Sequence, residues 1–63
     1  MCLSTVYRDK VSAENIVLSN VTRIECKDGM VILTDLLERQ VAIHGQLLMA
    51  NLIDGLAIIR EEG

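Results

Sequence analysis

Residues 21–34, with the sequence VTRIECKDGMVILT, decide the fold. Polar and apolar side chains alternate over residues 21–26, which is typical of a strand with one buried face. We expect Ile24 and Cys26 to point inward, and Val21 to lie on the opposite, outward face. Lys27-Asp28-Gly29 predicts a tight turn, because Asp-Gly tolerates the positive φ angles of a two-residue hairpin turn. Met30–Thr34 is apolar on both faces, which favours a central strand or one covered by a partner subunit. The stretch therefore predicts a β-hairpin.

Shorter strand patterns flank this hairpin on both sides. Before it, the sequence predicts strands at Leu3–Arg8 and Ile16–Leu18, separated by a loop over residues 9–15. After it, residues 35–39 form a connection, and Gln40–His44 alternates polar and apolar side chains as a strand does.

The last third of the chain is predicted to form a second hairpin. Gly45 indicates a bend or bulge, and the strands Gln46–Asp54 and Leu56–Arg60 flank Asp54-Gly55, a turn signal. An amphipathic helix over Gln46–Ile53 is the competing interpretation. The flanking glycines and the length of the segment favour the strand.

Together these segments predict an all-β fold, a small antiparallel SH3-like barrel, formed by a single domain over residues 1–63. A domain of this size gains only about 3–5 kcal/mol of net stability from its core. The chain is 51% apolar with a single aromatic residue, Tyr7, so it has more aliphatic side chains than one barrel should enclose. We therefore expect a homodimer that covers the surplus, which includes Val31, Leu33, Leu48 and Ile58.

Charge and composition limit the possible partners. The net charge is −3, and only six Lys and Arg residues are scattered along the chain, so a nucleic-acid partner is not expected. No apolar run approaches the length of a membrane span. Two cysteines without a secretory leader fit a reducing cytoplasm.

The amino terminus offers the most distinctive chemistry in the chain. The Met1 amine, the Met1–Cys2 peptide nitrogen and the Cys2 thiol can bind one metal ion and close two five-membered chelate rings. Planar, nitrogen-rich coordination favours Cu(II) or Ni(II) over zinc, and thiolate tends to reduce Cu(II), so Ni(II) is the better candidate. The alternative is that Cys2 is a small apolar residue at the start of a strand.

Other reactive side chains are explained by structural roles. Cys26 lies 24 residues from Cys2 without metal-site spacing, which predicts a buried apolar residue unless the fold brings the two thiols together. His44, the only histidine, is predicted on the outward face of its strand and becomes a ligand only if dimerisation brings it near the amino terminus. No nucleophile with a partnered base is evident, so the chain is not expected to be an enzyme.

Three segments resemble the CooT family: the opening Met-Cys-Leu-Ser-Thr-Val-Tyr, the Lys27-Asp28-Gly29 turn, and Asn51-Leu52-Ile53-Asp54-Gly55. The resemblance covers essentially the whole chain. It implies a small cytoplasmic homodimer that binds nickel through Cys2 and supports nickel delivery to carbon monoxide dehydrogenase. The alternative function is a metal-independent module that binds a protein or RNA, although the low content of basic residues argues against RNA.

Overall fold

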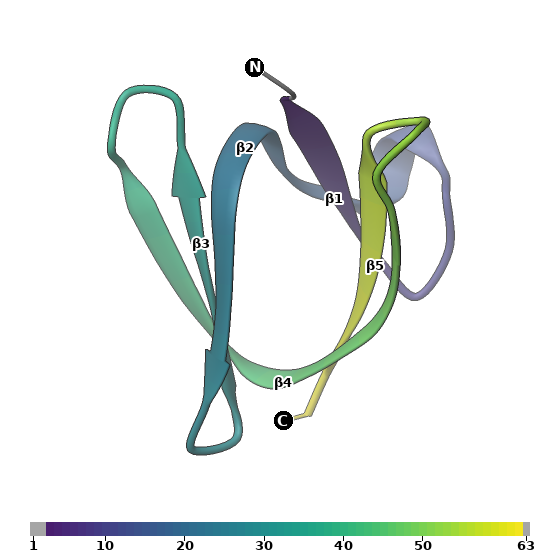
Figure 1. The fold of residues 1–63 in the computed structure, drawn as a ribbon. Helices are drawn as coiled ribbons and strands as arrows, with labels where there is room; N and C mark the ends of the chain where they lie inside the picture. Colours follow the sequence, from purple (N-terminus) through teal and green to yellow (C-terminus); the bar gives the residue numbers. More distant parts are fainter. Residues whose placement is uncertain (1–2, 63) are drawn as a thin grey trace.

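A computed structural model describes residues 3–62 as a closed five-stranded barrel (Figure 1). The elements in chain order are β1 (Ser4–Arg8), a single 3-10 turn η1 (Ala13–Asn15), β2 (Ile16–Lys27), β3 (Met30–Asp35), β4 (Gln40–Asn51) and β5 (Leu56–Glu61). Consecutive strands pair antiparallel, and β1 and β5 close the barrel as a parallel pair. An odd number of strands in alternating direction gives the first and last the same direction, so the closing pair is parallel. The predicted all-β, SH3-like barrel is confirmed. Among residues 3–62, no helix is long and apolar enough to cross a membrane.

The predicted β2–β3 hairpin is present. Asp28 and Gly29 have φ angles of 52° and 74°, and two positive φ angles at the centre of a turn match the right-handed twist of the paired strands. β3 pairs with β2 on one side and with β4 on the other, so neither of its edges is free. Its side chains Val31 and Leu33 are fully buried.

β2 and β4 are each a single strand of 12 residues where the sequence predicted two shorter ones. β2 pairs with β1 through its first half and with β3 through its second, and Asn20, with φ 57°, lies between the two halves. β4 pairs with β3 and then with β5. The competing helix over 46–53 is wrong, because this segment makes the β4–β5 ladder and the turn that follows it.

Gly45 allows β4 to pass from one neighbour to the other. A Cβ atom at this position would lie 1.9 Å from the backbone oxygen of Arg60 in β5, so no other residue fits without a shift of the backbone. The predicted bend is present: Figure 1 shows β4 curving beneath the barrel and rising again. As a result the β3–β4 and β4–β5 turns lie at the same end of the barrel, the end at which β1 begins.

The core gathers apolar side chains from all five strands: Val6, Val21, Val31, Leu33, Ile43, Ala57 and Ile59. Val31 and Leu33 belong to this core, so two of the residues that the sequence suggested as surplus are enclosed by one barrel. Val21 was expected to face outward and is 2% exposed. The pairing of β2 with β3 shifts register between Val21 and Arg23, and such a shift moves side chains to the other face.

Gly45→Ala should lower the free energy of unfolding by about 3 kcal/mol, because its new methyl group meets backbone that cannot rotate away. Gly29→Ala is the matched control. Its Cβ has no neighbour within 4 Å, so only the strain of a positive φ remains, about 1 kcal/mol. Urea denaturation of both variants measures the difference. Equal losses would contradict the role of close packing at Gly45.

Candidate functional site

An apolar groove of about 400 Å³ lies between β2 and the second half of β4. Its wall includes Cys26, Leu47 and Ala50. Each of these is paired with a buried residue on the neighbouring strand, namely Val31, Ile59 and Ala57. Directly opposed residues point to the same face of a sheet, so the three side chains point toward the barrel interior and are nevertheless exposed. In the groove, apolar side chains that point toward the barrel interior are not covered by other residues of the described range.

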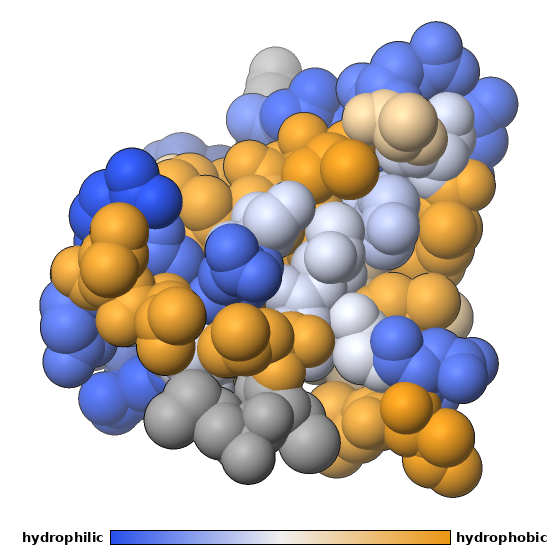
Figure 2. Space-filling model, turned by 90° about the horizontal axis from the view of Figure 1, so that it is seen from above, coloured by the Kyte–Doolittle hydropathy of each residue, from blue (hydrophilic) through white to orange (hydrophobic). Residues whose placement is uncertain are grey.

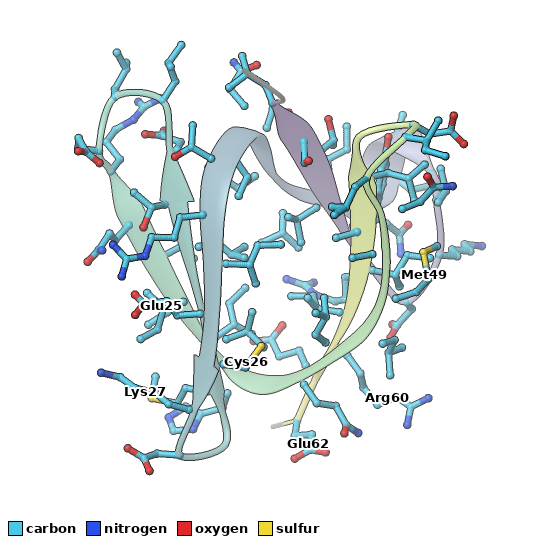
Figure 3. All side chains as sticks on the ribbon, in the orientation of Figure 1. Glu25, Cys26, Lys27, Met49, Arg60 and Glu62 are labelled. Carbon is cyan, nitrogen blue, oxygen red and sulfur yellow. The ribbon has the colours of Figure 1, made fainter. Side chains whose placement is uncertain are left out.

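Cys26 was predicted to be a buried apolar residue, and this prediction is wrong because the thiol is exposed. The expected inward direction is correct, since Cys26 shares its row with Val31 and Ile43. Cys26 is not covered, because β4 separates from β3 after His44 and pairs with β5 instead. This separation opens the groove beside Cys26. Figure 3 shows its sulfur in the space between β2 and β4.

His44 lies on the outward face of β4 and is exposed, as predicted. It pairs with Met30, one position along the ladder from the row that contains Cys26, so the imidazole and the thiol lie on opposite faces of the sheet. Over residues 3–62, no three His, Cys, Asp or Glu side chains are grouped closely enough to hold a metal ion.

Met1 and Cys2, the predicted metal ligands, lie outside the described residues. The structure fixes the place where the chain enters the barrel directly after them. Ser4 pairs with Val21, and the backbone N–H of Thr5 donates a hydrogen bond of 2.9 Å to the oxygen of Gly55. Ser4 also lines the groove. The entry point therefore lies at the groove and beside the β4–β5 turn.

The β3–β4 turn is organised around the carboxylate of Asp35, whose side chain is 2% exposed. Its Oδ1 atom accepts hydrogen bonds of 2.9 Å from the backbone N–H groups of Leu37 and Arg39, and its Oδ2 lies 2.8 Å from Nε of Arg39. Burial raises the pKa of Asp35, but the hydrogen bonds from Arg39 and Leu37 outweigh it, so the pKa lies below its ordinary value. This turn is thus held by an ionised carboxylate.

The β4–β5 turn is organised in the same manner around Asn51. Its side-chain oxygen accepts hydrogen bonds from the backbone N–H groups of Ile53 and Asp54, at 3.1 and 3.0 Å, and its amide nitrogen donates one to Asp54. The sequence predicted a connection over residues 35–39 and a turn at Asp54-Gly55, but Leu52 and Ile53 were assigned to a strand, and the exposed apolar residues of both turns were not predicted. An Asp or Asn followed by two bulky aliphatic residues, as in Asp35-Leu36-Leu37 and Asn51-Leu52-Ile53, is the signal that could have revealed them.

The arrangement of barrel, groove and entry point can be compared with known proteins. A family model described as CO dehydrogenase accessory protein CooT matches residues 1–60. The chain belongs to the CooT family. The matched range includes Met1 and Cys2. A crystal structure of a protein assigned as CooT from Carboxydothermus hydrogenoformans has a TM-score of 0.82 at 14% identity, covering 98% of this chain and 100% of that one. At this identity the CooT structure supports the fold alone. No curated protein matches the chain.

The Asp35 turn predicts a stability that depends on pH. Because the folded pKa is lowered, the contribution is fully present above the unfolded pKa of about 3.9 and is lost as the pH falls through the folded value. Asp35→Asn should be less stable at neutral pH and lose less stability on acidification below about pH 4. Urea denaturation at several pH values measures both effects, with Asp9→Asn at an exposed position as the control. Parallel pH profiles for wild type and Asp35→Asn would contradict this assignment.

Proposed function

We propose that this protein binds Ni(II) through Cys2 and Met1 and supports the maturation of carbon monoxide dehydrogenase in the cytoplasm, without catalysing a reaction itself. The observation that carries the proposal is the family match, which spans residues 1–60 and so includes the amine, peptide nitrogen and thiol of the first two residues. Nickel is here the cargo of the protein. Donors on the first two residues suit a cargo, because the ligands of an acceptor can replace them without any change in the barrel.

The barrel supports this function by fixing the base of the metal-binding segment. A chain spans at most about 3.6 Å per residue, so the donor atoms of Met1 and Cys2 stay within reach of Ser4. Ser4 is held by its pairing with Val21 and lines the groove. The proposed cargo site is therefore only a few residues along the chain from an apolar surface.

A homodimer accounts for the open groove. Within the described residues, the inward-facing side chains of Leu47 and Ala50 have no cover, and Leu48 beside them is 42% exposed. A second copy placed by a two-fold axis would cover both grooves at once. Since Ser4 lines the groove, the same axis would bring the two amino termini together. One nickel ion could then take a nitrogen and a sulfur from each chain.

Cys2→Ser should abolish tight nickel binding, because it removes the only thiolate of the proposed site. Cys26→Ser is the matched control. Its thiol is exposed in the single chain but lines the groove that the second copy would cover, so we expect some loss of stability and nearly unchanged nickel affinity. Calorimetric titration with Ni(II) measures affinity in both variants. Equal affinity of Cys2→Ser and wild type would refute the site, and an equal loss in both variants would place the Cys26 thiol among the ligands.

The dimer and the shared site predict a mass of two chains and one nickel per dimer. Ala50→Glu should give a monomer, because it places a charge in the groove, whereas Ala42→Glu, on the exposed outer face of β4, should stay dimeric. Light scattering at several protein concentrations measures the mass, and titration gives the stoichiometry. A wild-type mass of one chain at all concentrations would contradict the dimer.

The nickel affinity of the wild-type protein should fall below about pH 7, because binding releases protons from the thiol and nitrogen donors.

A further inference from the structure

Two turns at the end of the barrel where β1 begins expose bulky aliphatic side chains. In the β3–β4 turn, Leu36 and Leu37 are 49% and 70% exposed. In the β4–β5 turn, Leu52 and Ile53 are 75% and 97% exposed. Figure 2, which views this end from above, shows apolar groups at its left edge and at its lower right. Turn residues are ordinarily polar, so two apolar turns at one end mark an interaction surface.

Hydrogen bonds fix the backbone from which these side chains project. The backbone N–H of Leu37 is bound to the carboxylate of Asp35, and that of Ile53 is bound to the side chain of Asn51. A surface that is ordered before binding loses little conformational entropy when a partner docks. The two turns are therefore suited to recognise another molecule.

Charge indicates what kind of molecule fits. Each apolar pair is followed directly by an acidic residue, Glu38 in one turn and Asp54 in the other. Neither of them forms an ion pair with a Lys or Arg among residues 3–62. Arg39, in the β3–β4 turn, is paired with Asp35, and two further basic residues, Lys27 and Arg60, lie toward the opposite end of the barrel (Figure 3). A complementary surface has apolar pockets flanked by basic side chains.

The same charges disfavour a second copy of the chain at this end. In a two-fold interface each patch meets its own counterpart. A patch whose Glu38 and Asp54 have no Lys or Arg partner among residues 3–62 would then meet a second patch of the same net charge, and this weakens the interface. The groove, whose floor is apolar, carries no such penalty.

We propose that this rim, formed by Leu36, Leu37 and Ile53 with Glu38 and Asp54, docks a protein that presents apolar pockets flanked by Lys or Arg. Leu52, beside Ile53, also lines the groove and is left out of the rim. Resting on the proposed function, that protein is the nickel-free carbon monoxide dehydrogenase. The chain enters the barrel between the two turns (Figure 1), so docking on the rim brings the metal-binding segment against the acceptor.

Biolayer interferometry with nickel-free carbon monoxide dehydrogenase from the same organism tests the proposal. The double variant L37S/I53S should bind at least about tenfold more weakly than wild type, because it removes two central apolar contacts. The control V11S/I16S alters side chains that are also exposed, at 52% and 44%, but lie outside the rim, and it should bind like wild type. Glu38→Lys should slow association and weaken its dependence on salt.

Nickel titration and light scattering of the same variants separate this proposal from the proposed function. L37S/I53S should bind nickel like wild type and keep the same mass. Cys2→Ser should lose nickel and still dock. Unchanged enzyme binding by L37S/I53S, or no binding by wild type, would overturn the rim as a docking surface whatever the nickel titration gives. A change in the mass of L37S/I53S would show that a second copy covers the rim, and would overturn it as well.

Discussion

The close approach of β5 to Gly45 in β4 is the constraint on which the rest of the barrel depends. A single Cβ atom would lie 1.9 Å from the Arg60 oxygen, so the two strands meet only where one of them has no side chain. Because β4 can bend there, it pairs with β3 and then with β5. The bend brings two turns to the end where the chain begins and opens the groove beside Cys26. The position of the candidate site follows from this one contact.

Local patterns were sufficient to predict most of the strands. The Asp28-Gly29 turn, the apolar strand after it and the bend at Gly45 each depend on residues that are adjacent in sequence, and all three are present. The errors concern relations between strands. Val21 was assigned to the wrong face because the register shift in the β2–β3 pair is not visible in an alternating pattern.

The same distinction between local patterns and relations between strands applies to the candidate site. The donor groups of Met1 and Cys2 could be proposed from the sequence, because their chemistry depends only on their covalent neighbours. The exposure of Cys26 could not, because it depends on where β4 leaves β3. Leu52 and Ile53 were assigned to a strand, and the competing interpretation placed them on a helix face. Their exposure comes from hydrogen bonds to Asn51 that end β4.

The two proposed surfaces respond to acid over different pH ranges, and this has a consequence for transfer. The thiol and amine donors hold protons at neutral pH in the absence of metal, so mild acidification competes directly with nickel. The turn that displays Leu37 is held by the carboxylate of Asp35, whose pKa is lowered by the hydrogen bonds from Arg39 and Leu37, and it stays ionised well below neutral pH. The proposed cargo site can therefore empty while the docking rim keeps its shape. Under the two proposals, loss of nickel and loss of the acceptor would be separate events, because one depends on Met1 and Cys2 and the other on a turn of the barrel.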